Sequence, residues 1–197
     1  MPNVPPPAPM TMPPMLGYTV HGSFVAQSNP YITIGQGRTN TKISPANPVA
    51  DSYWIVILDA NNPVNKVKEF VVPGANNTAV PAGLDTYMSN PAYLFAVVTQ
   101  TLSNVHVPQG DFYDYLVAHG AGRELQRLEQ LNVQKACGSS GAVSYLLTGG
   151  GGPAGKRSPA YEMGSVNNAA LLVMSLMPTS SGQPPYSLCN SYTFVTR

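Results

Sequence analysis

The sequence predicts an α+β fold, a single β-rich domain built as a mixed twisted sheet or a sandwich, with one main helical region at 111–131. Two runs, 53–58 and 93–99, are continuous aromatic and β-branched stretches, which is typical of strands buried on both faces. Residues 111–131 carry apolar side chains at helical spacing. A length of 197 residues suits one domain with appendages.

Residues 1–15 predict an extended arm, because they hold seven prolines and four methionines. Proline fixes φ and removes a donor, which excludes a helix or a central strand and favours polyproline II. Such a composition has two interpretations, a disordered tail or an arm that docks into apolar grooves of an adjacent subunit. Interleaved apolar side chains favour docking. The expected contact residues are Val4, Met10, Met12, Met15 and Leu16.

The predicted domain spans 16–178 and opens with strands at 16–27 and 31–34, followed by a loop over 35–48 that is rich in turn residues. The run at 53–58 and the alternating run at 64–72 then form a hairpin around a turn at 59–63. We expect the first strand of this hairpin to be central and the second to be half exposed. Trp54, the only tryptophan, should bury more apolar area than any other residue.

The second half of the domain begins with a short helix at 82–88 and the apolar strand at 93–99. Asp111 is the expected N-cap of the main helical region. Glycines at 120 and 122 interrupt its apolar stripe, which predicts two helices joined near Gly120.

Two further strands are expected at 142–148, before a run of four glycines, and at 169–177. Residues 179–197 then form a tail with a short strand at 192–195.

Charge is low, since charged residues are 10% of the chain and the net charge is +1. General electrostatics therefore predicts neither nucleic-acid nor membrane binding, and a charge-poor surface favours an oligomeric protein. Residues 1–15 lack the basic and apolar regions of a signal peptide, so we expect no export by an ordinary signal. Cys137 and Cys189 define neither a disulfide scaffold nor a metal site, and we expect both thiols to be reduced.

The run at 150–157, Gly-Gly-Gly-Pro-Ala-Gly-Lys-Arg, is close to a phosphate-binding loop. Arg157 stands where a hydroxyl should bind Mg²⁺, and Pro159 opposes the helix that should follow. We therefore interpret the run as a basic surface loop, without nucleotide or other cofactor.

Titratable residues form no recognisable catalytic set or metal site. The histidines, at 21, 106 and 119, fall in three different expected elements, without the paired spacing of metal ligands. Asp111 and Asp114 share a helical face, but acidic residues are favoured at a helix N-terminus in any case. We expect no catalytic, cofactor-binding or metal-binding residues, and hence no enzyme.

Tyrosine is abundant, with eleven residues. Its ring suits both sugar stacking and protein interfaces, although many tyrosines lie at core edges. The candidates for glycan contact are those expected beside loops, namely Tyr87, Tyr161 and Tyr186.

Several short motifs occur in an order that resembles the interleukin-like EMT inducer (ILEI/PANDER) domain family. They lie at 55–59, 66–70, 84–87, 93–98, 107–110, 125–131 and 145–150. The resemblance covers roughly residues 53–162 and implies a compact β-rich α+β domain used in extracellular recognition, with carbohydrate contact in some members. The chain departs from the secreted members because it lacks their signal peptide and their paired cysteines. The family pattern supplies no catalytic residue.

Together these features predict a non-enzymatic structural protein of a large assembly, with other subunits as partners of the arm. A virion fits best, for instance as a bacteriophage capsid-decoration or tail component assembled in the host cytoplasm. The alternatives are an extracellular glycan-binding module of the ILEI type and an unrecognised hydrolase.

Overall fold

A computed structural model describes residues 15–25, 28–135, 141–151, 159–166, 168–180 and 183–189. The strands are β1 (Leu16–His21), β2 (Tyr31–Gln36), β3 (Thr39–Ile43), β4 (Ser52–Asp59), β5 (Lys66–Pro73), β6 (Tyr93–Gln100), β7 (Leu102–Ser103), β8 (Ala142–Gly150), β9 (Tyr161–Ser165), β10 (Leu171–Ser180) and β11 (Gln183–Cys189). The helices are η1 (Gly74–Asn76), α1 (Asp85–Met88), η2 (Asn104–His106), α2 (Gly110–Ala118) and α3 (Arg123–Lys135).

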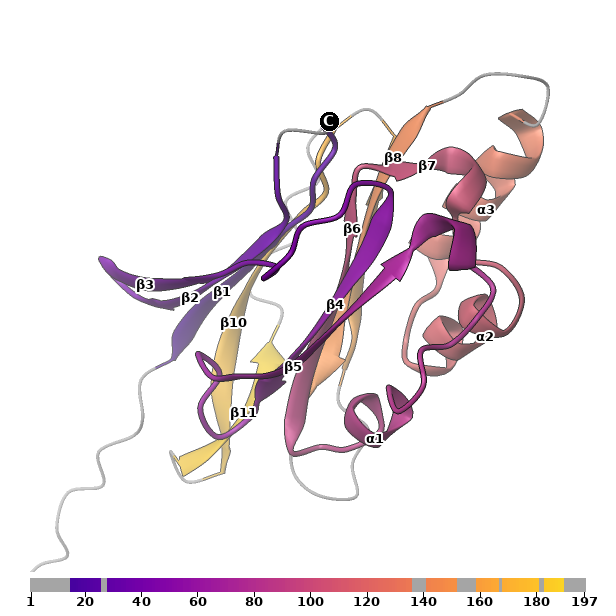
Figure 1. Cartoon of the computed structure of the whole chain (residues 1–197). Coiled ribbons are helices and arrows are strands. Elements are labelled where there is room, and N and C mark those ends of the chain that lie inside the picture. The colour runs from indigo at the N-terminus through magenta and orange to yellow at the C-terminus, as the bar shows by residue number, and fades with distance from the viewer. Residues whose placement is uncertain are drawn as a thin grey trace, which may run out of the picture.

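The strands form two sheets that lie face to face, and the α-helices cover the far side of one of them (Figure 1). The open sheet has the order β11-β10-β1-β2-β3, and the covered sheet has the order β5-β4-β6-β8-β7, with β9 also paired to β8. Each ladder between these strands is antiparallel. The predicted β-rich α+β class is therefore confirmed, in its sandwich form.

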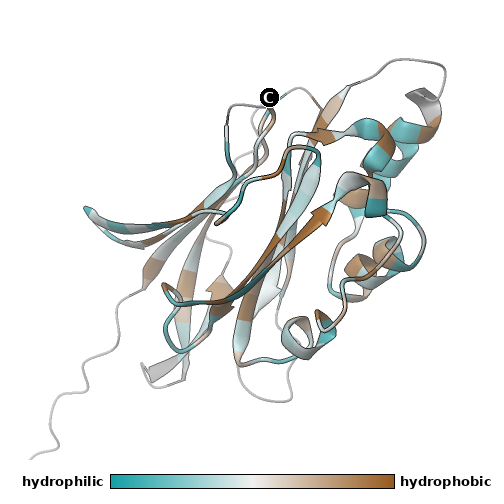
Figure 2. Ribbon diagram, viewed as in Figure 1, coloured by the Kyte–Doolittle hydropathy of each residue, from teal (hydrophilic) through white to brown (hydrophobic). Residues whose placement is uncertain are grey.

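The strands of the covered sheet are apolar throughout because this sheet is the middle layer. In β4, Trp54 and Val56 point into the inner core between the sheets, whereas Tyr53 and Ile55 point into the outer core under the helices. All four side chains are fully buried. The predicted hairpin is confirmed, with β4 between β5 and β6 and with β5 at the sheet edge. Figure 2 shows the apolar colour along strands of both layers.

The predicted division of the helical region is also confirmed, and the break at Gly120 has a local cause. The N–H of Gly120 donates to the carbonyl of Val117 at 3.1 Å, and that of Ala121 donates to the carbonyl of Leu116 at 3.0 Å. These are the two hydrogen bonds of a Schellman motif, with Gly120 at φ 105°. A side chain at this position would also collide with Ala160, 2.4 Å from an added Cβ.

Four strands were not expected from the sequence: β3, β7, β9 and β11. Residues 39–43 were predicted as loop, but β3 is an exposed edge strand of polar residues that alternates too weakly to be recognised. The predicted domain end at 178 falls inside β10, and β11 follows in the same sheet. The N-cap of α2 is Gln109 rather than Asp111, which lies in the first turn. The expected strand at 192–195 lies outside the described residues.

Candidate interaction surface

The outward side of the open sheet carries apolar side chains that nothing in the described chain covers. Along β10, Leu172, Met174 and Leu176 point into the inner core. The alternate residues Leu171, Val173 and Met177 point outward and remain 46%, 44% and 42% exposed. Strands with one wet face normally alternate apolar with polar side chains, and β10 departs from this rule at Leu171, Val173 and Met177 but not at Ser175.

The strand register places these residues beside a polar strip on β1, β2 and β3. Val173 pairs with Thr19, which pairs with Thr33, which pairs with Lys42. In the next row Leu171 pairs with His21, which pairs with Tyr31. We call this surface the open face and define it by Thr19, His21, Tyr31, Thr33, Lys42, Leu171, Val173 and Met177. It is apolar along β10 and polar to basic toward β3.

Aromatic and cationic side chains lie at the polar side of the open face, on β1, β2 and β3. The His21 and Tyr31 rings stack at 4.7 Å and 7°, and the Lys42 Nζ lies 4.3 Å from the Tyr31 centroid. The buried Nδ1 of His21 has no hydrogen-bond partner among the described residues. The Tyr31 ring is therefore held between His21 of β1 and Lys42 of β3, and β1 separates it from the apolar strip on β10.

The predicted arm reaches the domain at the centre of the open sheet. Met15 is 55% exposed, whereas Leu16 opens β1 opposite Leu176 and packs against the inner core. Leu16 thus belongs to the packing of its own domain. Val4, Met10 and Met12 lie outside the described residues, and their docking stays a prediction.

The three tyrosines proposed for glycan contact do not share a surface. Tyr87 lies on α1, with its ring 5.3 Å from that of Tyr93 and 6.1 Å from that of Phe70. Tyr161 begins β9 and packs against the inner core. Tyr186 was expected beside a loop, but it is 8% exposed in β11 and its ring is part of the inner core, which removes it as a sugar platform. Sequence could not show this because β11 was not recognised.

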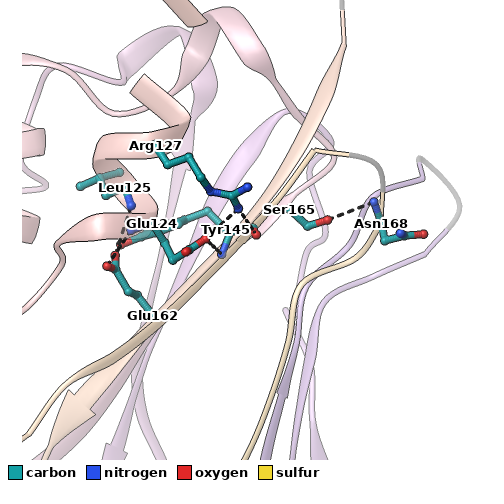
Figure 3. A network of polar contacts seen from close by, with 8 residues as sticks. Glu124, Leu125, Arg127, Tyr145, Glu162, Ser165 and Asn168 are labelled. Atoms are coloured by element: carbon teal, nitrogen blue, oxygen red, sulfur yellow. Dashed lines mark hydrogen bonds and ion pairs between the residues drawn. The ribbon is translucent and has the colours of Figure 1, made fainter. Parts of the chain in front are cut away.

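A carboxylate network joins β9 to α3 (Figure 3). Glu162 accepts the N–H groups of Glu124 at 2.9 Å and Leu125 at 3.3 Å, and it also accepts the Tyr145 hydroxyl at 3.1 Å. Glu124 in turn accepts the N–H of Gly164 at 3.2 Å and pairs with Arg127 at 2.7 Å. Burial, followed by the charge of Glu162, raises the pKa of Tyr145 well above its ordinary value. The network satisfies two free N–H groups of the α3 N-terminus, those of Glu124 and Leu125, and so holds α3 on the sheet.

A second carboxylate, that of Asp51 just before β4, lies between η1 and the β7–η2 segment. Asp51 adopts a positive φ of 54°, and its side chain accepts the N–H of Ser103 at 2.9 Å and approaches His106 Nδ1 at 2.7 Å. Its carbonyl accepts the N–H of Gly74 at 2.7 Å. An added Cβ on Gly74 would lie 2.7 Å from the Asp51 carboxylate, so glycine is required there. These contacts hold Asp51 in its strained backbone conformation, and they give the residue a structural role.

The third group, Ser89, His119 and Asp85, bears on the hydrolase alternative. Ser89 Oγ lies 3.2 Å from His119 Nε2, and His119 Nδ1 lies 2.8 Å from the carbonyl of Tyr115. The Ser89 hydroxyl donates to Asp85 at 2.6 Å. In a catalytic triad the carboxylate binds the histidine Nδ1, whereas here Asp85 accepts the serine proton and lies 3.9 Å from His119 Nε2. The arrangement therefore does not match an activated nucleophile. The sequence does not reveal it, because Ser89 and His119 follow the ends of two separate helices, α1 and α2.

The glycines that resemble a phosphate loop have a packing role where the structure describes them. An added Cβ on Gly150 would lie 2.3 Å from the Tyr93 carbonyl oxygen, and one on Gly151 would lie 2.2 Å from that of Tyr186. Both have positive φ, 90° and 72°. Glycine is thus required where β8 ends against β6 and β11. Residues 152–158, with Lys156 and Arg157, lie outside the described residues, as does Cys137.

Within the described residues, no three or more His, Cys, Asp or Glu side chains are grouped as metal ligands. In the same part of the chain, no helix has the length and apolar character needed to cross a bilayer. Cys189 lies half-buried in β11.

Comparisons with known proteins found no matching family model, no similar curated protein and no similar solved structure.

Proposed function

We propose that the chain is a non-enzymatic structural subunit of a large assembly. The assembly that its composition fits best is a virion, in which the chain would be a capsid-decoration or tail component of a bacteriophage. The observation that carries this proposal is the apolar strip of Leu171, Val173 and Met177 on the open face. Apolar side chains exposed together on one sheet face mark interaction sites, although here the buried Ser175 stands between Val173 and Met177. Low charge adds support, because few charged groups oppose association.

The contrast between the two sheets strengthens the proposal. The covered sheet has its outer side packed under three α-helices, and the open sheet has no such layer among the described elements. A neighbouring subunit would supply the missing layer. The hydrophobic effect would then favour burial of the three β10 side chains, as it favours burial of β4 under the helices.

The test is the behaviour of purified full-length protein over a wide concentration range. Sedimentation should show regular oligomers, and electron microscopy should show rings, sheets or tubes. Microscopy of particles from the native source should place the chain in a symmetric shell or tail. A protein that stays monomeric at all accessible concentrations and is absent from particles would refute the proposal.

The glycan-binding alternative is favoured by one observation, the ring cluster of Phe70, Tyr87 and Tyr93 around α1. All three rings are half-buried, and Lys68 Nζ lies 5.9 Å from the Phe70 centroid. A partly exposed aromatic ring beside a cation suits a sugar ring that carries acidic groups. A glycan array should then show binding that Tyr87→Ala removes and Tyr161→Ala retains. No binding above background would leave this alternative without support.

A further inference from the structure

We propose that the apolar strip of the open face is the docking site for residues 1–14 of a second copy of the chain. The inference rests on the proposed structural function and names both the partner segment and the surface that receives it. The occupant is the predicted extended arm, and the receiving residues are Leu171, Val173 and Met177.

The position at which the arm joins the domain supports this assignment. β1 is the central strand of the open sheet, and Leu16 at its start pairs with Leu176 of β10. The arm therefore departs next to the apolar strip, at the end of β10 that carries Met177. Arm and strip are both present in every copy, so neighbouring copies bring the two elements together reciprocally or in a chain.

The chemistry of the two surfaces is matched. Residues 1–15 contain no Asp, Glu, Lys or Arg, and their side chains are mostly Pro and Met. The strip consists of Leu171, Val173 and Met177, with Ser175 between the last two. Its neighbours on β1 are His21, Thr19 and Gly17. Methionine adapts its shape to irregular apolar surfaces. Proline lacks the N–H that a sheet edge needs, which favours a sheet face over the exposed edge strand β3.

Length and stiffness favour exchange between copies over folding back within one copy. From Leu171 to Met177 the strip is about 20 Å long at about 3.3 Å per residue. Fourteen residues in polyproline II span about 43 Å, which covers the strip and leaves a connection. To reach its own open face the arm would have to reverse just before Met15. Pro13 and Pro14 disfavour such a reversal, because each fixes φ and restricts the preceding residue to extended conformations.

The test uses two full-length variants and their mixture. Met10→Asp combined with Met12→Asp disables the arm and leaves the face intact, whereas Val173→Asp disables the face and leaves the arm intact. Sedimentation should show each variant alone associating at least about tenfold more weakly than the wild type. An equimolar mixture should form complexes of two subunits and no larger, because each variant keeps one half of the contact.

Val67→Asp is the matched control, since Val67 is a strand valine with 39% exposure on the covered sheet. It should associate like the wild type. Val173→Thr, which keeps the β-branched shape, is the second face variant if Val173→Asp fails to fold. It should weaken association in the same direction.

The outcomes separate the inference from the function on which it rests. A wild type that associates while both face variants associate equally well overturns the docking site and leaves the structural function standing. Loss of association in the face variants alone, with the arm variant unaffected, assigns the strip to another occupant, such as residues 190–197, and overturns the arm. A mixture that stays monomeric overturns exchange between copies, and a wild type that never associates overturns both proposals.

Discussion

The covered sheet and the open sheet are built from similar strands but differ in what lies on their second face. In the covered sheet, β4 presents Tyr53, Ile55 and Ile57 to the helices and buries them completely. In the open sheet, β10 presents Leu171, Val173 and Met177 to solvent. Apolar content alone therefore does not reveal whether a strand face is covered. The neighbouring layer decides, and in the open sheet that layer is expected from another molecule.

Trp54→Ala should have the largest effect, because it removes the largest fully buried side chain of the covered sheet. We expect a loss of about 3–5 kcal/mol in the free energy of unfolding, measured by urea denaturation. Trp54→Phe is the control. It keeps a ring but loses the indole N–H that donates to Glu69 at 3.1 Å, and it should cost less, about 1–2 kcal/mol. A loss below 1 kcal/mol for Trp54→Ala would mean that the middle layer does not carry the stability.

Glu162→Gln tests how the helical layer is attached to the covered sheet. The amide keeps the shape of the side chain but points a donor at groups that already donate, namely the N–H groups of α3 and the Tyr145 hydroxyl. We expect a loss of about 1–3 kcal/mol in unfolding free energy. Asp114→Asn on exposed α2 surface should change it by less than about 0.5 kcal/mol. Equal effects for the two variants would show that the network does not hold α3.

Tyr18→Phe tests the bond between the two sheets, since the Tyr18 hydroxyl lies 3.0 Å from Thr148 Oγ1. At neutral pH we expect a cost of about 1 kcal/mol in unfolding free energy. Burial raises the pKa of Tyr18 above its ordinary value, opposed by the weaker effect of the Thr148 hydrogen bond. The unfolded tyrosine then ionises first, so the stability of the wild type should fall as pH rises above about 10.

The measurement for Tyr18 is urea denaturation from pH 8 to pH 11. Tyr18→Phe should lose stability less steeply than the wild type above pH 10, because one buried hydroxyl no longer contributes. Thr148→Val keeps the phenol and removes its partner, so it should retain the steep fall. Parallel curves for wild type and Tyr18→Phe would contradict the assignment.

Val173→Thr should have the smallest effect on the isolated subunit. The side chain is 44% exposed on the open face, so the unfolding free energy measured at low protein concentration should change by less than about 0.5 kcal/mol. Val20→Thr is the matched change on the inward side of the same sheet, where Val20 is fully buried. It should lower the unfolding free energy by about 1–3 kcal/mol, because it places a hydroxyl in the inner core without a hydrogen-bond partner. A large cost for Val173→Thr would show that the open face is packed within the subunit.

Strands of the middle layer were predictable because burial on both faces removes polar residues from them. The runs at 53–58 and 93–99 correspond to β4 and β6 for this reason. The edge strand β3 was missed because Thr39–Lys42 are exposed and need no apolar alternation. β11 was missed because its two prolines suggested a loop. Proline is tolerated there because both prolines fall where the β10–β11 register shifts, between the pairs Pro178–Tyr186 and Ser180–Gln183.

Local features follow from the residues themselves: the apolar runs, the β4–β5 hairpin turn and the division of α2 from α3 at Gly120. Each depends on residues close together in the chain and on intrinsic backbone preferences. Three other features exist only in the folded chain. They are the covering of particular sheet faces, the burial of Tyr186 while Tyr87 contacts Phe70 and Tyr93, and the capping of α3 by Glu162, 38 residues from Glu124. These depend on which distant segments the sheets bring into contact, and one sequence read along its length does not contain that information. The apolar strip on β10 is the clearest case, because its residues have the same pattern as a buried strand and differ only in what lies above them.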